Sequence, residues 1–276
     1  MLLRRDPSPV LRPFVRTLWA AEQPSLPHRP AGCRERVFPT GDMHIAFRLS
    51  DHPLWLFRDV DDPAGYTAGH AVLGGARATP YVRDTSAPAR SVGALLRPGA
   101  AQLLFGEPAD TFAGRHTLLD DLWGRSAALA REQLLDAGHP ERQLDILESI
   151  LAARLPRLRG IHPAVAQALE QFPITPDVRE AVKQSGYSHR RFITLFRQAV
   201  GLTPKLYCRL LRFRRAVDRI KAAQVAPWAG LALAAGYSDQ AHFNREFREF
   251  AGVTPEAYRK ISPQLAFHVP VLPSTS

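Results

Sequence analysis

At 276 residues, 45% of them hydrophobic, the chain is long enough for one large domain or two ordinary ones, each with its own buried core. It has no run of about 18 apolar residues and no N-terminal signal segment, so we expect a cytoplasmic protein with no membrane partner. Cys33 and Cys208 are its only cysteines, which excludes a disulfide framework and a cysteine zinc site, and we expect no metal and no cofactor.

The positive charge is concentrated in the second part of the chain. Residues 160–276 hold 16 Lys and Arg against 8 Asp and Glu, and so carry +8 of the net charge of +10. This asymmetry fits a polyanionic partner for the second part, or simply a basic solvent-exposed surface. Charge alone does not decide between the two.

The first part of the chain has the pattern of a β-rich domain. Residues 11–20 predict a short strand or helix, and PTGD (39–42) is a turn signal. The segment that follows alternates, with Ile45, Phe47 and Leu49 on one face and His44, Ala46 and Arg48 on the other. Strands are predicted at 44–49, 53–59, 71–78 and 91–96.

The pattern becomes helical after Pro98-Gly99. We expect a short helix at 100–106 and two longer ones at 118–137 and 141–156, the last ended by Pro156. The last helix carries a leucine stripe with spacings of three and four: Leu144, Leu147, Leu151 and Leu155. This stripe allows either a homodimer or packing onto the chain's own β-rich domain, and both alternatives stay open.

The second part contains an internal repeat, which decides its architecture. The segment Gly186-Tyr187-Ser188 matches Gly236-Tyr237-Ser238, and the second copy has one extra residue before its first phenylalanine. Seven further residues of the first copy have identical counterparts in the second: Phe192, Phe196, Arg197, Gly201, Thr203, Pro204 and Tyr207 correspond to Phe243, Phe247, Arg248, Gly252, Thr254, Pro255 and Tyr258.

Each copy is predicted to be a helix-turn-helix unit. Gly186 and Gly236 suit the left-handed end of a first helix, and Ser188 and Ser238 suit the N-cap of the second. The second helix of such a unit can enter the major groove of DNA. An ordinary bundle with a duplicated helix pair would explain the phenylalanines, glycines and prolines. It would not explain why both second helices combine Arg, Gln and His, with Asn added in the second copy, in the only strongly basic part of the chain.

A single helix at 204–223 is predicted to join the two units. Twenty residues span about 30 Å, close to the ~34 Å of one DNA turn, so both second helices can reach successive major-groove segments. Five arginines lie along this connecting helix, and we expect some of them to contact phosphates and the others to face solvent. They are Arg209, Arg212, Arg214, Arg215 and Arg219.

Residues 162–260 resemble the DNA-binding domain of AraC/XylS-type bacterial transcription regulators. The resemblance is carried by the two repeated segments, GYSHRRFITLFRQAVGLTPKLYCR and GYSDQAHFNREFREFAGVTPEAYR. The resemblance implies seven helices, two helix-turn-helix units and a connecting helix. It implies DNA contacts by His189, Arg190, Ile193, Thr194 and Arg197 in the first unit, and by Gln240, Ala241, Asn244, Arg245 and Arg248 in the second. Thr194 departs from the family, in which an arginine is common at this position.

The first part resembles, more faintly, a sensor-like domain found ahead of such DNA-binding domains, through FPTGDMHIAF (38–47), LLRPGAAQLLFGEPADTF (95–112) and LLDDLWG (118–124). The expected fold is therefore a two-domain α+β protein, with a β-rich domain at 1–157 that ends in two helices and an all-α domain at 158–276.

The function that we expect is sequence-specific DNA binding by a transcription regulator without enzyme activity or catalytic residues, controlled by a small-molecule effector or by dimerisation. RNA polymerase is a further expected partner. The alternative is an enzyme or small-molecule-binding protein in the first part, with DNA binding secondary.

Overall fold

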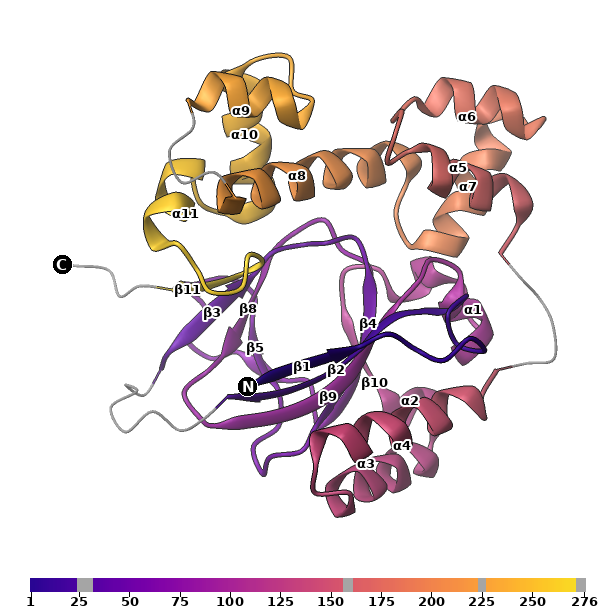
Figure 1. The fold of residues 1–276 in the computed structure, drawn as a ribbon, viewed down its shortest axis with the longest axis vertical. Helices are drawn as coiled ribbons and strands as arrows, with labels where there is room; N and C mark the ends of the chain where they lie inside the picture. Colours follow the sequence, from indigo (N-terminus) through magenta and orange to yellow (C-terminus); the bar gives the residue numbers. More distant parts are fainter. Residues whose placement is uncertain (24–31, 156–160, 223–226, 272–276) are drawn as a thin grey trace.

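The computed structural model describes residues 1–23, 32–155, 161–222 and 227–271. Two sheets and a group of helices form the β-rich part (residues 1–155), and seven helices form the helical part (residues 161–261) above it (Figure 1). This confirms the expected fold class. Residues 268–271, expected within an all-α domain, instead add a strand to one of these sheets. The boundary expected at 157/158 falls in residues 156–160, outside the described residues.

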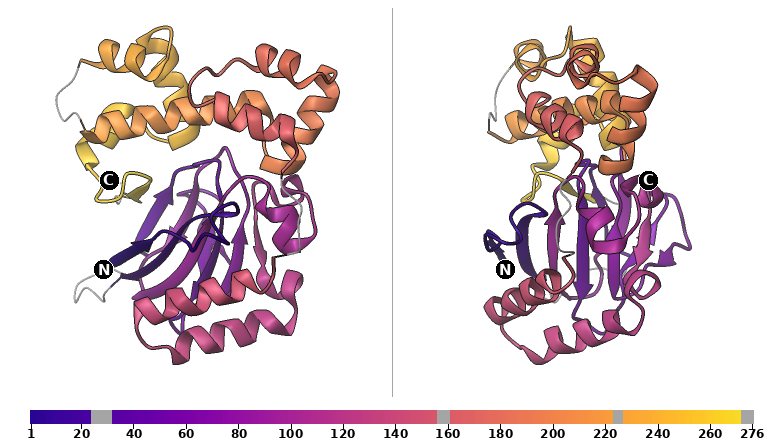
Figure 2. Two further views of the ribbon diagram at one scale, coloured as in Figure 1. Left: turned by 45° about the vertical axis from the view of Figure 1, so that its right-hand side comes forward. Right: turned by 90° about the vertical axis from the view of Figure 1, so that its right-hand side faces the viewer.

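Two antiparallel sheets face each other in the β-rich part (Figure 2). The first has the order β1 (Leu2–Arg5), β2 (Val15–Gln23), β9 (Ala89–Leu96), β4 (Met43–Arg48), β7 (Ala71–Gly74) and β10 (His116–Leu118). The second has the order β11 (His268–Val271), β3 (Arg34–Val37), β8 (Tyr81–Asp84), β5 (Trp55–Phe57) and β6 (Tyr66–Thr67). The four predicted strands are confirmed as β4, β5, β7 and β9, and residues 11–20 contribute to a strand rather than a helix. Strands β1, β3, β6, β8, β10 and β11 were not predicted.

The first helices of the chain differ in two places from the expectation. Helix α1 (Ala100–Phe105) and a short 3-10 helix, η1 (Ala109–Phe112), follow β9. The helix expected at 118–137 is divided into α2 (Leu119–Trp123) and α3 (Arg125–Asp136) by Gly124, whose φ of 55° breaks the helix. Helix α4 (Pro140–Ala152) ends before Pro156, so the prediction that this proline ends the helix was wrong.

Helices α3 and α4 cover the outer face of the first sheet. Leu144, Leu147 and Leu151 are fully buried there, with α4 packed on β2 and β9. The face of β4 that carries Ile45 and Phe47 is buried against the same helices. The leucine stripe is therefore part of the chain's own core, and it no longer supports a homodimer.

The helical part has the two-unit arrangement that the repeat predicted. Helices α5 (Pro163–Gln171), α6 (Val178–Ser185) and α7 (His189–Val200) form the first unit, and α9 (Trp228–Ala235), α10 (Gln240–Ala251) and α11 (Pro255–Ile261) form the second. The 19 residues of α8 (Pro204–Ala222) lie between them. Gly186 and Gly236 end α6 and α9 with φ of 70° and 92°, as predicted for the turns of both units.

Phe38 connects the two parts. It follows β3, but its ring is buried among Phe213 of α8, Phe247 of α10 and Tyr258 of α11, with centroid distances of 5.9, 6.4 and 5.6 Å. Its backbone amide donates to the carbonyl of Phe267, just before β11, which pairs with β3. A side chain of the β-rich part thus completes the core of the second helix-turn-helix unit.

We expect Phe38→Ala to lower the free energy of unfolding by about 3–5 kcal/mol, because it leaves a cavity within an aromatic cluster. Backbone hydrogen exchange should also become faster in α10 and α11, although these helices are distant from Phe38 in the sequence. Phe57→Ala is the control: Phe57 is a buried ring of β5 that lies under Arg34, and its loss should leave exchange in α10 unchanged. Unchanged protection of α10 in Phe38→Ala would contradict this role.

Candidate nucleic-acid interface and interdomain cavity

Helices α7 and α10 each divide into a buried apolar face and an exposed polar face. Phe192 and Phe196 of α7, and Phe243 and Phe247 of α10, are fully buried. They lie four residues apart, so the other side of each helix is left for a partner. The periodicity of the sequence predicted this division in both helices.

The exposed face of α7 contains four of the five residues expected to contact DNA, namely His189, Arg190, Thr194 and Arg197, while Ile193 is half-buried. The Thr194 hydroxyl donates to the carbonyl of Arg190 (3.1 Å), which leaves mainly its methyl group for a base. Arg197 Nε lies 3.0 Å from the carboxylate of Asp110 in η1, so this arginine is tied to the β-rich part.

The exposed face of α10 brings together all five expected residues, Gln240, Ala241, Asn244, Arg245 and Arg248. Its N-cap is Asp239, whose carboxylate accepts from the amide of His242 (2.7 Å), and not Ser238 as expected. The extra residue of the second copy moves the cap forward by one position. In the first unit Ser188 is the cap, as predicted.

A buried carboxylate, which the sequence did not reveal, holds α10 on α8. Glu246 is 3% exposed and lies in the sequence between Arg245 of the exposed face and Phe247 of the buried face. It accepts from Arg209 Nε (2.7 Å) and from Arg212 Nε and Nη2 (both 3.1 Å). The one available signal was a glutamate on the apolar face of an amphipathic helix.

The arginines of the connecting helix mostly serve the protein's own structure. Arg209 and Arg212 bind Glu246, Arg214 donates to the carbonyl of Thr40 (3.2 Å) and pairs with Asp42 (3.3 Å), and Arg215 donates to the carbonyl of Pro173. The expectation that some of these residues simply face solvent is therefore wrong for these four, and their contact with phosphates stays a prediction. Each of them satisfies a buried or neighbouring acceptor instead.

We expect Glu246→Ala to destabilise the second unit by about 3–5 kcal/mol, because it leaves the partly buried guanidinium group of Arg212 without a carboxylate and that of Arg209 with only the exposed Glu249. DNA binding should weaken although Glu246 does not face the recognition surface. Glu249→Ala is the matched control, since Glu249 also pairs with Arg209 (2.5 Å) but is 56% exposed, and should cost at most about 1 kcal/mol. Chemical denaturation and DNA titration of both variants test this, and equal costs would contradict it.

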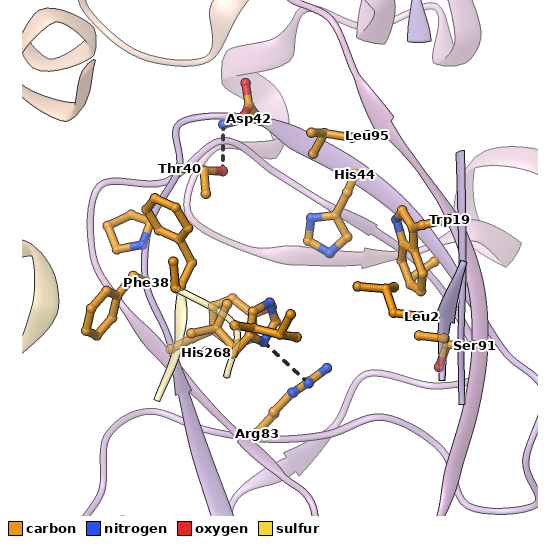
Figure 3. A pocket seen from close by; sticks show the side chains of 18 of the residues that line it. Leu2, Trp19, Phe38, Thr40, Asp42, His44, Arg83, Ser91, Leu95 and His268 are labelled. Carbon is orange, nitrogen blue, oxygen red and sulfur yellow. Dashed lines mark hydrogen bonds between the residues drawn. The ribbon is translucent and has the colours of Figure 1, made fainter. Parts of the chain in front are cut away.

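A cavity of about 650 Å³ lies between the two sheets. The second face of β4, with His44, Ala46 and Arg48, lines it, and Trp19 of β2 and Arg83 of β8 point into the same space (Figure 3). Alternation in the sequence separated the two faces of β4, but it carried no information on what the polar face meets. In the structure it meets a cavity and not bulk solvent.

Two strand glycines make room for the rings that line this cavity. His44 stands opposite Gly74, and Trp19 stands opposite Gly93, in neighbouring strands. A Cβ atom on Gly74 would lie 2.1 Å from His44 Cε1, and one on Gly93 would lie 2.4 Å from Trp19 Cζ2. Each ring therefore lies over the backbone of the neighbouring strand, and only a glycine at that point of the strand leaves room for it.

His44 and the neighbouring His116 are neutral at pH 7. Burial, and then the charge of Arg77, lowers the pKa of His44 to about 4. The same two causes lower the pKa of His116 to about 2, and its Nδ1 lies 3.2 Å from Arg77 Nη2. Neutral His116 can accept this hydrogen bond from the guanidinium group.

Residues of the helical part and of the C-terminal segment complete the cavity wall. Arg214 and Lys221 of α8 line it, together with residues 264–268. His268 of β11 lies 3.0 Å from Glu35, which also accepts from Arg83 Nε (2.7 Å). Burial would raise the pKa of Glu35, but the hydrogen bond with His268 and the charge of Arg83 outweigh burial and lower it to about 2. Glu35, Arg83 and His268 were not singled out from the sequence, because their short polar strands carry no motif.

No cluster of three or more His, Cys, Asp or Glu that could hold a metal ion occurs in the part of the chain that the structure describes. His70, one of the scattered histidines of the β-rich part, lies with Nε2 3.0 Å from the carbonyl of Asp51. Among residues 1–23, 32–155, 161–222 and 227–271, no helix is long and apolar enough to cross a bilayer.

Sequence comparison gives a family for each part of the chain. Residues 181–261 match the family described as a helix-turn-helix domain, and residues 3–117 match a domain of unknown function (DUF6597). An uncharacterized HTH-type transcriptional regulator of Haemophilus influenzae is 26% identical over 102 residues, which are 37% of this chain and 34% of the relative. The match thus spans about a third of the relative's length.

Two solved structures illustrate the structural similarity. A transcriptional regulator of Chromobacterium violaceum with an AraC-type DNA-binding domain is 24% identical, with a TM-score of 0.33 over 37% of this chain and 94% of that chain. ToxT from Vibrio cholerae is 9% identical, with a TM-score of 0.45 over 88% of this chain and 98% of that chain.

The two capped recognition helices and the family match define the helical part as a double helix-turn-helix DNA-binding domain. It is a domain of the AraC type, so the resemblance to AraC/XylS regulators carried by the repeated segments is confirmed.

His44 predicts a pH dependence of stability. Between pH 6.5 and about 4 the unfolded chain takes up a proton at His44 that the folded chain does not, so the free energy of unfolding falls as the pH falls through this window. The slope is up to about 1.4 kcal/mol per pH unit for each such histidine. Glu35, with its lowered pKa, adds a loss only below about pH 4.5.

Urea denaturation at pH 7, 6 and 5 measures this slope. His44→Gln should flatten it, whereas His139→Gln, a change at an exposed position on the α3–α4 connection, should leave it unchanged. Equal slopes in wild type and His44→Gln would show that His44 takes up its proton in the folded chain as well.

Proposed function

We propose that the protein is a sequence-specific DNA-binding transcription regulator whose helices α7 and α10 enter successive major-groove segments. The observation that carries this proposal is the pair of exposed polar faces at the two ends of α8, each backed by buried phenylalanines. A helix of 19 residues is about 28 Å long, which is close to the ~34 Å between major-groove segments on one side of DNA.

We propose that the cavity binds a small-molecule effector. Its wall includes residues of both parts of the chain, so a molecule in the cavity would contact the element that joins the two recognition units. Arg214 connects α8 to Asp42 and Thr40 at this junction, and Asp42 also pairs with Arg16 (3.0 Å). Binding that changes these contacts would change the position of α8 and with it the spacing of the recognition helices.

This function places the protein in the cytoplasm, with double-stranded DNA as its main partner and RNA polymerase as a further one. A homodimer remains part of the proposal, although its interface is not the leucine stripe of α4. We expect the cavity to bind its molecule without turnover, and conversion of a bound compound would favour an enzyme instead.

The two recognition helices should read bases with unequal stringency. Arg245 can make a bidentate contact to guanine, and Gln240 and Asn244 can each pair with adenine, whereas Ile193 and Thr194 offer mainly methyl contacts. Arg245→Ala should cost about 1–3 kcal/mol of binding free energy and relax base preference in one half of the site. Thr194→Ala should cost clearly less.

Selection of binding sites from randomised DNA with wild type and both variants measures this asymmetry. Arg248→Ala is the control for backbone contacts, because loss of a phosphate contact should weaken binding to all sequences alike and reduce the salt dependence. A site whose half read by α7 is as restrictive as the half read by α10 would contradict the asymmetry. A protein that shows no sequence preference at all would contradict the proposed function.

A further inference from the structure

The cavity between the sheets contains more positive charge than the carboxylates around it can balance. Its wall includes four arginines of the β-rich part: Arg4, Arg48, Arg77 and Arg83. Of the acids, Glu35 pairs with Arg83, Asp42 pairs with Arg16 and Arg214, and Asp218 of α8 lies in the wall as well. Arg48 and Arg77 have no carboxylate within ion-pair distance among the described residues.

Arg48 is 9% exposed and has one hydrogen bond from its guanidinium group, a long one (3.3 Å) from Nε to the carbonyl of His52. Asp84 acts on it only at longer range and accepts two hydrogen bonds from Ser86 instead (2.7 and 2.6 Å). Burial, and then the charge of Arg83, lowers the pKa of Arg48 to about 10, so the residue remains charged at pH 7. A buried charge in this position is costly unless an anion meets it.

Arg77 has neutral partners only. Its guanidinium group lies 4.4 Å from the ring centroid of Tyr81, and its Nη2 faces Nδ1 of the neutral His116. These contacts fix the direction of the guanidinium group and leave its charge uncompensated. A planar guanidinium group held in one direction is suited to two parallel hydrogen bonds with a carboxylate or phosphate.

The rest of the cavity wall is largely apolar. Leu2, Trp19, Leu54 and Leu95 belong to it, and Figure 3 shows Trp19, Leu2 and Leu95 on the same side as His44. A volume of about 650 Å³ exceeds what an inorganic anion fills and lies within the range of small-molecule sites. The position between two sheets favours a small molecule over a nucleic acid or a protein chain.

We propose that the effector is a small organic acid, whose carboxylate or phosphate monoester group is bound by Arg48 or by Arg77, the two guanidinium groups of the wall without a carboxylate partner, and whose apolar body lies against Trp19 and the cavity leucines. The inference rests on the proposed function for its regulatory meaning, but the binding site stands on its own geometry. The acid would supply the negative charge that the cavity lacks.

Calorimetric titration of the full chain tests the charge requirement. The probes are phenylacetate, 4-phenylbutyrate and 6-phenylhexanoate, each beside its neutral amide, and phenyl phosphate to separate the two acid classes. We expect at least one acid to bind about tenfold or more tightly than its neutral counterpart, because hydrogen bonds to charged groups are the stronger ones. If no acid of the panel binds more tightly than the matching amide, the inference is wrong. This comparison needs no variant.

Arg48→Gln and Arg77→Gln test the assigned residues. At least one of them should lose about tenfold or more of the acid affinity and keep the affinity for the amide. Without ligand, their melting temperatures should stay equal to that of wild type or rise, because an uncompensated buried charge is removed. Arg90→Gln is the matched control: Arg90 lies on β9 beside β4 and likewise donates to a carbonyl, that of Leu49 (3.3 Å), but it is exposed. Acid binding that is unchanged in both cavity variants would overturn the assignment.

Binding to DNA, measured in the same preparations, separates this inference from the proposed function. DNA binding by wild type without any preference for acids refutes the acid site alone. Acid binding without any DNA binding refutes the proposed function and leaves the site in place.

Discussion

The position of Phe38 in the aromatic cluster of α8, α10 and α11 is the contact on which the arrangement of the whole chain depends. The four residues after it add contacts of other kinds. Thr40 offers its carbonyl to Arg214, Gly41 takes a φ of 77° beside Leu210, and Asp42 pairs with two arginines. One short loop thus combines apolar packing, a backbone acceptor and a buried charge at the junction. The sequence predicted a turn here and could not indicate that the turn inserts into another domain's core.

Three buried or nearly buried carboxylates follow one pattern. Glu246, Asp42 and Glu35 are each shared by two basic side chains, and each joins elements that are distant in sequence. Removing one partner of such a group leaves an uncompensated charge, so these contacts fix geometry more than they add stability. Arg209, Arg212 and Arg214 of the helical part are neutralised in this way. Net charge therefore overstates how much of that part is available to DNA.

The success of sequence interpretation differed between the two parts for a physical reason. In the helical part, repeated glycines, caps and phenylalanines specify local geometry, and the helices and both recognition faces followed from them. Short polar strands such as β3 and β8 have no such local signal, since they are specified by partners far along the chain. The cavity was invisible for the same reason: His44 and Arg48 share a face by alternation, but the opposite sheet decides whether that face meets water. Even a strong motif can mislead by one position: the extra residue in the second copy moved the N-cap of α10 from Ser238 to Asp239.

The pairing of β11 with β3 has a consequence for how the chain can be divided and folded. Strand β3 lies between β8 and β11, and β11 follows the last helix of the DNA-binding domain. A fragment that ends before the first helix-turn-helix unit would present β3 as an open edge, with unpaired backbone groups that can pair with another copy. During synthesis this edge stays open until the helical part has been made. The DNA-binding domain therefore acts as a covalently attached folding partner of the domain that precedes it, and separate expression of the two would remove that protection.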